Sequence, residues 1–203
     1  MSIIFVRHGE SEANLLGEFS NRGLKHPLTD VGRIQAAELA SSFDPDREHV
    51  IFCSPLLRAL ETAQVIAAYL EVKVLVSDAL REYDVGVFEG RSDQRSWEAF
   101  ADLTEAWFAR AEFDSRMEGG ESLNDIRARF LPFIAGLGPE SVAKDVICVG
   151  HGGTYRCMMP LLFDNVDFEF ASSHGIGHTM KITGAWNGVS WTCLNWGDHK
   201  FQT

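Results

Sequence analysis

A short apolar run near the start of the chain ends abruptly in reactive side chains, and this limits the fold more than any other stretch. Residues 3–6 have the length and composition of a buried strand, and Arg7, His8 and Gly9 follow directly, before a polar segment that suits a helix. In open α/β sheets, ligands collect outside the carboxyl ends of the strands, where helix N-termini offer free N–H groups to anions. We therefore expect Arg7 and His8 to lie at a ligand-binding edge of a sheet.

Further apolar runs alternate with helical patterns along the chain. Residues 49–53, 72–76 and 145–149 are predicted strands, and residues 179–182 and 189–196 a terminal hairpin around a turn at 184–188. Helices are predicted to begin at Thr29, at Ser54 with Pro55, at Ser122 and at Thr154. Strand, turn and helix in repeated succession predict an α/β fold of three layers, with helices on both faces of a mostly parallel sheet.

Residues 83–120 differ from the rest of the chain. They lack strand signals and hold an aromatic helical pattern of Trp97, Phe100, Leu103 and Trp107 between two loops. We interpret this segment as a cap inserted over the carboxyl ends of the strands. With 203 residues, the chain suits one domain, residues 1–203, which includes this cap.

Composition excludes several classes of partner. A formal net charge of -11 argues against general affinity for nucleic acid or acidic membranes, because both require a positive protein surface. No apolar window of membrane-spanning length and no secretory leader pattern is present, so we expect a cytoplasmic protein. The four cysteines lie in apolar or alternating segments without metal-ligand spacing and are expected to be reduced core residues.

A parallel sheet would gather four basic side chains that are far apart in the sequence. Arg7 and His8 follow the first predicted strand, Arg58 lies just after the second, and His151 follows the fourth. Two guanidinium groups and two imidazoles make a compact positive pocket in an acidic protein, and the planar fork of arginine matches phosphate oxygens. The sequence therefore predicts a site for a phosphoryl group.

The same residue types suggest how the site would react. One neutral imidazole can attack phosphorus, while the other, with both arginines, stabilises charge on the phosphoryl oxygens. Glu82, just after the third predicted strand, is our candidate for the acid that protonates the departing alcohol and for the base that later activates water. This scheme uses no metal and no cofactor, and it predicts hydrolysis of a phosphorylated small molecule.

Six sequence elements, in order from the N-terminus to about residue 156, resemble the histidine phosphatase superfamily, which includes the cofactor-dependent phosphoglycerate mutases. A lone Arg-His-Gly would be weak evidence, but six ordered elements are specific. They are Arg7-His8-Gly9-Glu10-Ser11 with Asn14, Pro27-Leu28-Thr29 with Gly32, Ser54-Pro55-Leu56 with Arg58, Leu80-Arg81-Glu82 with Phe88-Glu89-Gly90, Gly119-Gly120-Glu121-Ser122, and Gly150-His151-Gly152-Gly153.

The resemblance implies a role for each matching position. His8 would be phosphorylated transiently, and Glu82 would be the proton donor. Arg7, Arg58 and His151 would bind the phosphoryl group, helped by Asn14 and the backbone N–H of Gly152. The chain departs from the family in the loop before Pro27, where Lys25 and His26, together with Arg22, give a more basic segment. This departure leaves the substrate open.

Three functions remain as alternatives. Family mutases carry a longer, more basic insertion after the acid position, whereas the insert here is mainly acidic, so a phosphatase is favoured over a phosphoglycerate mutase. A non-catalytic module that binds phosphorylated ligands is the third reading. The residues behind the charge comparison are Glu89, Glu98, Asp102, Glu105, Glu112 and Asp114 against Arg91, Arg95, Arg110 and Arg116.

Two further points stay open. His174 and His178 have the i, i+4 spacing of zinc ligands, but the glycines between them argue against a helix, and we expect them to border the pocket rather than to bind metal. The sequence does not decide between a monomer and a homodimer.

Overall fold

The architecture is the predicted three-layer α/β arrangement, a central sheet with helices on both faces, and the sheet has seven strands where the sequence predicted six. A computed structural model describes residues 2–137 and 144–202, and the strand order in its sheet is β3-β2-β4-β1-β5-β6-β7. The pairs β2–β3, β2–β4 and β1–β4 are parallel, whereas β5 to β7 add an antiparallel edge. The strands are β1 (Ser2–Arg7), β2 (His49–Cys53), β3 (Val74–Val76), β4 (Asp145–Gly150), β5 (Lys181–Trp186), β6 (Trp191–Trp196) and β7 (His199–Lys200).

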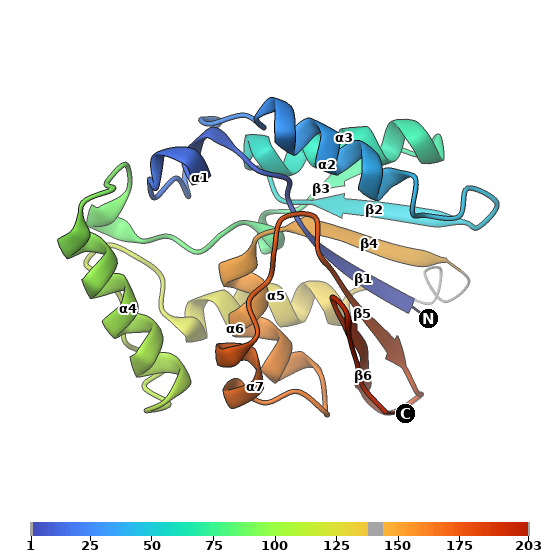
Figure 1. Ribbon diagram of the computed structural model, residues 1–203. Coiled ribbons are helices and arrows are strands. Elements are labelled where there is room, and N and C mark those ends of the chain that lie inside the picture. Colours follow the sequence, from blue (N-terminus) through green and yellow to red (C-terminus); the bar gives the residue numbers. More distant parts are fainter. Residues whose placement is uncertain (1, 138–143, 203) are drawn as a thin grey trace.

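Two helical layers enclose the sheet. In Figure 1, α2 and α3 lie above the parallel strands, and α5, α6 and α7 lie below them. The helices are α1 (Glu12–Leu16), α2 (Asp30–Ala40), α3 (Leu57–Leu70), α4 (Gln94–Phe108), α5 (Leu123–Ala135), α6 (Gly152–Leu162) and α7 (Phe168–Ser173), with two 3-10 turns, η1 (Asp78–Leu80) and η2 (Gly86–Phe88).

Strand β1 supplies side chains to both layers of the core. Ile4 and Val6 pack with the α2 and α3 side, whereas Ile3 and Phe5 pack with the α5 and α6 side. Successive side chains of a strand point to opposite faces, so a continuous apolar run fits a strand that is covered on both sides. This burial fixes the end of β1 firmly, and with it the position of the residues that follow.

Several helix starts agree with the sequence. Thr29 is the N-cap of α2, and its hydroxyl accepts a hydrogen bond from the Gly32 N–H at 2.9 Å. Ser122 and Asp125 form the expected capping box at α5. Helix α6 begins two residues before the predicted start at Thr154, at Gly152.

Two local predictions were wrong. Helix α3 begins at Leu57 with Leu56 as N-cap, instead of being capped by Ser54, because the Ser54 hydroxyl accepts from the Leu56 N–H and contacts His151. The turn of the terminal hairpin lies between β5 and β6, at residues 187–190, because Gly184 is paired with Cys193 within the sheet.

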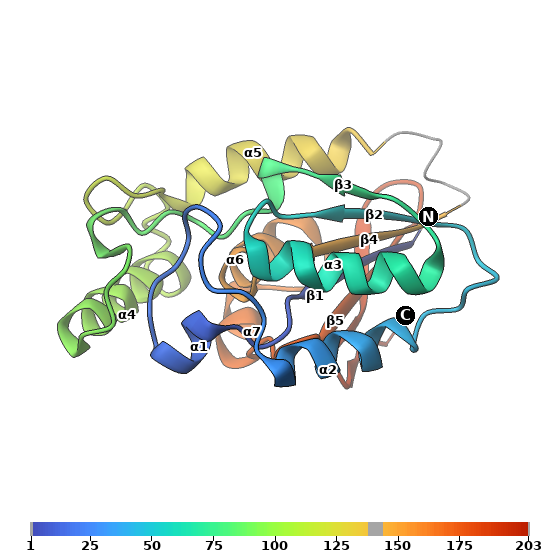
Figure 2. The same cartoon turned by 90° about the horizontal axis from the view of Figure 1, so that it is seen from above.

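The segment 83–120, called the cap segment from here on, lies beyond the carboxyl ends of the parallel strands. Figures 1 and 2 show α4 on the side of the molecule opposite the N-terminus of β1. Trp107 of α4 is fully buried in the same core cluster as Phe5 and Phe130, which ties the segment to the body of the protein. None of the helices within residues 2–137 and 144–202 has the length and hydropathy to cross a membrane.

Candidate active site

The two histidines singled out in the sequence lie side by side because of the sheet register. Strands β1 and β4 are neighbours, and Arg7 pairs with Gly150, so His8 and His151 each follow a paired residue. Their ring centroids are 5.2 Å apart. Both rings are buried, at 3% and 0% exposure, which shields them from bulk water.

The surroundings of His8 define which of its ring nitrogens carries the proton. Nδ1 lies 2.6 Å from the carbonyl oxygen of Gly9, and a carbonyl can only accept, so Nδ1 is the protonated nitrogen. Nε2 lies 3.0 Å from Nε of Arg58, which can only donate, so Nε2 presents a lone pair. Burial first, and the positive charge of Arg58 second, hold the pKa of His8 well below its usual value. His8 is therefore a neutral imidazole with an unprotonated nitrogen.

His151 has one ring nitrogen bound and one available. Its Nε2 lies 2.7 Å from the hydroxyl of Ser54, the residue that follows β2. Its Nδ1 is buried and has no partner within the described part of the chain. When the Ser54 hydroxyl donates to Nε2, the proton of the neutral ring lies on Nδ1, where it is free for an oxyanion. Burial and the charge of Arg58 lower the pKa of His151 well below its usual value.

Arg7 is held from the other side of the site by His178. Its Nη1 donates to the carbonyl oxygen of Ile176 at 2.6 Å, and its Nη2 donates to Nε2 of His178 at 3.0 Å. Burial, followed by the charge of Arg7, lowers the pKa of His178 to about 4, so His178 is neutral at pH 7. Neither His174 nor His178 lines the cavity described below, but His178 contacts Arg7, which does, and so orients this guanidinium.

His174 contacts other residues than His178 does. Its ring stacks on Phe170 with centroids 3.9 Å apart, and its Nδ1 lies 2.9 Å from the Phe170 carbonyl oxygen. Across residues 2–137 and 144–202, no group of three or more His, Cys, Asp or Glu side chains is arranged to hold a metal ion.

The carboxylate of Glu82, which follows η1 in the sequence, contacts the N-terminus of α6, the helix that begins directly after His151. Its carboxylate accepts hydrogen bonds from the Gly153 N–H at 3.0 Å, the Thr154 N–H at 2.7 Å and the Thr154 hydroxyl at 2.8 Å. A Cβ atom on Gly153 would lie 2.8 Å from Oε1 of Glu82, so only glycine allows this approach. Glu82 therefore meets residues that lie 71 and 72 positions later in the sequence, at the start of the helix that follows His151.

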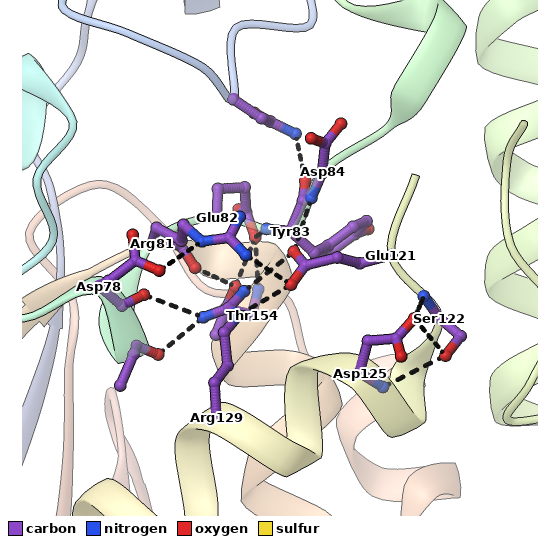
Figure 3. A network of polar contacts seen from close by, with 12 residues as sticks. Asp78, Arg81, Glu82, Tyr83, Asp84, Glu121, Ser122, Asp125, Arg129 and Thr154 are labelled. Atoms are coloured by element: carbon purple, nitrogen blue, oxygen red, sulfur yellow. Dashed lines mark hydrogen bonds and ion pairs between the residues drawn. The ribbon is translucent and has the colours of Figure 1, made fainter. Parts of the chain in front are cut away.

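Glu121 braces the segment that carries Glu82. The carboxylate of Glu121 accepts from Arg81 at 2.7 Å, from Arg129 at 3.0 Å and from the backbone N–H of Asp84 at 2.9 Å (Figure 3). Arg81 and Asp84 flank Glu82 along the chain, so both sides of the acid are fixed. We call Arg81, Glu121 and Arg129 the Glu121 brace.

A cavity of about 380 Å³ opens above these groups. It is lined by six of the seven residues predicted from the sequence, whereas His151 lies beneath the lining and is fully buried. The six are Arg7, His8, Asn14, Arg58, Glu82 and Gly152. Asn14 uses its Oδ1 to accept from Ser11, which leaves its amide N–H groups as the donors for a ligand.

Ser20 is a site residue that the sequence did not reveal. It lines the cavity, its carbonyl oxygen accepts from Nη1 of Arg58 at 2.6 Å, and its buried hydroxyl has no partner within the described residues. A buried hydroxyl without a partner is costly unless a ligand or water satisfies it. Nothing in the loop sequence distinguished Ser20 from its neighbours, because its position depends on Arg58, which is distant in sequence.

Two of the three basic residues noted before Pro27 contact acidic side chains, and none of the three lines the cavity, although Ser20 and Asn21 of the same loop do. Arg22 forms a bidentate pair with Asp84 at 2.8 and 2.7 Å, and His26 lies 3.1 Å from Glu18. Lys25 is exposed. Asp84 and Glu18 therefore occupy Arg22 and His26, and this departure from the family pattern adds no positive charge to the cavity lining.

The fold and the site define a class of α/β protein in which two buried histidines and two arginines meet beside a cavity at the carboxyl ends of parallel strands. Comparison with known proteins identifies the family within this class. The family model described as "Histidine phosphatase superfamily (branch 1)" matches residues 3–199, and the chain belongs to this superfamily of enzymes.

Similar proteins include both phosphatases and mutases. The chain is 31% identical to phosphoserine phosphatase 1 of Hydrogenobacter thermophilus over 162 residues, covering 78% of this chain and 74% of the relative. It is 32% identical to the 2,3-bisphosphoglycerate-dependent phosphoglycerate mutase of Rhizobium etli over 170 residues, covering 77% and 78%. The structure of a mycobacterial glucosyl-3-phosphoglycerate phosphatase in complex with VO3 aligns with a TM-score of 0.81 and 25% identity, covering 98% of this chain and 99% of that one.

Proposed function

We propose that this protein is a phosphatase that hydrolyses the phosphate monoester of a small molecule through a phosphohistidine at His8. The observation that carries the proposal is the tautomer of His8, since its unprotonated Nε2 lies in hydrogen-bond contact with the Arg58 guanidinium at the cavity. A neutral nitrogen fixed next to a cationic group is what an in-line attack on a bound phosphoryl group requires.

In the first half of the reaction, Nε2 of His8 forms a bond to phosphorus as the bond from phosphorus to the ester oxygen breaks. Glu82, in its protonated form, gives its proton to that oxygen, and the alcohol departs. Arg7, Arg58, His151, the N–H of Gly152 and the amide of Asn14 stabilise the charge on the transferring phosphoryl oxygens.

In the second half, the Glu82 carboxylate accepts a proton from water as the water oxygen attacks the phosphohistidine. The bond between Nε2 and phosphorus breaks, inorganic phosphate forms, and His8 returns to its neutral state. The hydrogen bonds from Gly153 and Thr154 hold the Glu82 carboxylate in position for this step. No metal ion takes part in either half.

The cavity lining favours hydrolysis over the mutase alternative. A mutase must retain a bisphosphate while it turns over, and this needs cations away from the reacting phosphoryl group. Among the described residues of the lining, Arg156 is the single arginine besides Arg7 and Arg58, and Glu18 lies in the same lining. The cavity therefore offers one cation away from the reacting phosphoryl group rather than the cluster that a retained bisphosphate would need.

The test is release of phosphate from an aryl phosphate in the presence of a chelator, combined with detection of the labelled protein. We expect turnover, and a label on the protein that is labile in acid and stable in base. His8→Asn is expected to lower kcat at least a thousandfold and to abolish the label. His199→Asn, a change in exposed β7, is the matched control and leaves both unchanged.

Each alternative has its own signature in the same assay. Turnover by His8→Asn close to that of the unchanged protein contradicts the proposal. Conversion of 3-phosphoglycerate that depends on a bisphosphate primer identifies a mutase. Binding of inorganic phosphate without any ester hydrolysis identifies a non-catalytic module.

A further inference from the structure

Five aromatic rings line the cavity in addition to the groups around His8. They are Phe19 from the loop after α1, Tyr83 beside Glu82, and Trp97, Phe100 and Phe108 from α4, and we call them the aromatic wall. These rings come from three separate segments, so the fold itself assembles them. Asn21 and Thr104 add polar atoms to the lining, and the rings offer a large apolar area to the alcohol part of a substrate.

The rings hold one another in place. Phe19 packs against Trp97 and Phe100 with centroids 4.1 and 5.2 Å apart, and Tyr83 lies parallel to Phe100, with 3° between the planes and 6.0 Å between centroids. The indole N–H of Trp97 donates to the carbonyl oxygen of Gly17 at 3.0 Å, which fixes the orientation of this ring. The aromatic wall is therefore preorganised, and a flat apolar ring is the group that it fits.

The guanidinium of Arg156 lies next to one ring of the aromatic wall. Arg156, on α6, donates from Nε to the Ala171 carbonyl oxygen at 3.2 Å and from Nη2 to the Ser172 carbonyl oxygen at 3.1 Å, and its guanidinium lies 5.3 Å from the centre of the Phe108 ring. Its Nη1 has no partner in the described part of the chain. Arg156 also lines a second hollow of about 400 Å³, which shares Thr104 and Phe108 with the first.

Four carboxylates share the two hollows with Arg156. Glu105 and Glu169 line the second hollow, and Glu18 and Glu82 line the first, where the Glu18 carboxylate lies 3.1 Å from Nε2 of His26. Within the described part of the chain Arg156 forms no ion pair with any of them, so its Nη1 remains available as an N–H donor. A carboxylate or other anion on the substrate would find a charge-assisted hydrogen bond here.

We propose that the substrates are phosphate monoesters of alcohols with a flat apolar ring, which lies against the aromatic wall, and an anionic substituent, which binds Arg156. This inference rests on the phosphatase reaction proposed above and adds the class of its leaving group. A polyol phosphate is disfavoured because its hydroxyl groups would lose water against the rings without gaining partners.

The test compares esters whose leaving groups have similar reactivity. Propyl phosphate and benzyl phosphate are both esters of primary alcohols, so a difference in kcat/KM between them reports mainly on binding of the ring. We expect benzyl phosphate to exceed propyl phosphate at least tenfold. We expect 3- or 4-carboxybenzyl phosphate to exceed its neutral carboxamide counterpart roughly tenfold again, the scale of a charge-assisted hydrogen bond.

Variants separate the two halves of the proposal. Arg156→Gln is expected to remove the advantage of the carboxylate while changing kcat/KM for benzyl phosphate less than threefold. Phe100→Leu is expected to lower the preference for benzyl over propyl phosphate. Arg95→Gln, on the exposed part of α4 and outside the cavity lining, is the matched control and changes neither ratio.

The outcomes distinguish this proposal from the proposed function. Equal kcat/KM for all the esters, with turnover that still depends on His8, contradicts the substrate class and leaves the phosphatase intact. A carboxylate preference that survives Arg156→Gln contradicts the assignment of Arg156. Absence of turnover with every ester contradicts the phosphatase itself.

Discussion

The reactivity that we propose for His8 depends on its contacts with the neighbouring Gly9 and with one arginine that is distant in the sequence. The Gly9 carbonyl fixes the proton on Nδ1, and Arg58 occupies the lone pair of Nε2 until an anion enters. The sequence identified the residue types, because each histidine comes at the end of an apolar strand and is followed by a glycine. It could not identify the tautomer, which depends on a side chain 50 positions away.

Residue-level prediction also failed where a role depends on long-range contacts. Ser54 reads as a helix cap in the sequence, but its hydroxyl serves His151. Ser20 carries no sequence signal, and His178 was placed at the pocket without a partner. In each case, the deciding contact spans at least 38 positions, from Ser20 to Arg58, and local patterns contain no information about it.

Gly153 provides a sharp test of how Glu82 is positioned. In Gly153→Ala, the new methyl group would lie 2.7 Å from a ring carbon of Tyr83 and 2.8 Å from the Glu82 carboxylate, so the acid must move. We expect kcat for an alkyl phosphate, which needs a proton donor, to fall about a hundredfold, the scale of general acid catalysis. For an aryl phosphate, whose leaving group needs less assistance, the loss should be much smaller.

Gly177→Ala is the matched control for this substitution. A Cβ atom at Gly177 meets nothing within 4 Å and Gly177 lies outside the cavity lining, so kcat for both esters should stay unchanged. Steady-state kinetics on the two esters measure the effect. Equal losses for the alkyl and aryl esters in Gly153→Ala would contradict the assignment of Glu82 as proton donor.

At the level of elements, the alternation of apolar strands with capped helices was sufficient to predict the parallel part of the sheet and both helical layers. Thr29 and Ser122 capped their helices as expected, because each interaction is local. The antiparallel edge was less predictable. Strand β7 is only two residues long, and Gly184 lies in a paired strand position although glycine usually marks a turn.

We expect the Glu121 brace to stabilise the short stretch between η1 and the cap segment, which carries Glu82. Glu121 is 14% exposed at its side chain and binds two guanidinium groups as well as the backbone of Asp84. Glu121→Gln removes the charge that holds Arg81 and Arg129, so the segment carrying Glu82 should loosen. We expect the free energy of unfolding to fall by about 1.5–3 kcal/mol, the range for hydrogen bonds to charged groups.

A positioning role for Glu121 should also appear in the kinetics. We expect Glu121→Gln to lower kcat more for alkyl than for aryl phosphates, with KM nearly unchanged, because proton donation is affected and phosphate binding is not. Glu118→Gln, three residues earlier on the exposed surface, is the control. Loss of stability without this difference between esters would show that the brace is structural only.

At the level of the whole molecule, burying two neutral imidazoles links folding to pH. His8 and His151 have lowered pKa values in the folded state, mainly through burial, so the folded protein leaves them unprotonated where the unfolded chain protonates them. The unfolded state then binds more protons below about pH 6.5, and stability falls as the pH falls. The slope is up to about 1.4 kcal/mol per pH unit for each histidine.

Denaturant unfolding between pH 7 and pH 5 measures this linkage. We expect the free energy of unfolding to decrease below pH 6.5 in the unchanged protein. The double variant His8→Asn with His151→Asn should show a shallower decrease. An equally steep decrease in the double variant would assign the pH dependence to other groups.

The pairing of Arg7 with Gly150 across β1 and β4 ties chemistry to assembly of the backbone. Because side chains alternate along a strand, slippage of one strand past the other by a single position would turn the imidazoles toward different helical layers. Turnover recovered after refolding therefore measures the fraction of molecules in which β1 and β4 have paired in the native register. Activity thus serves as an assay of correct strand pairing.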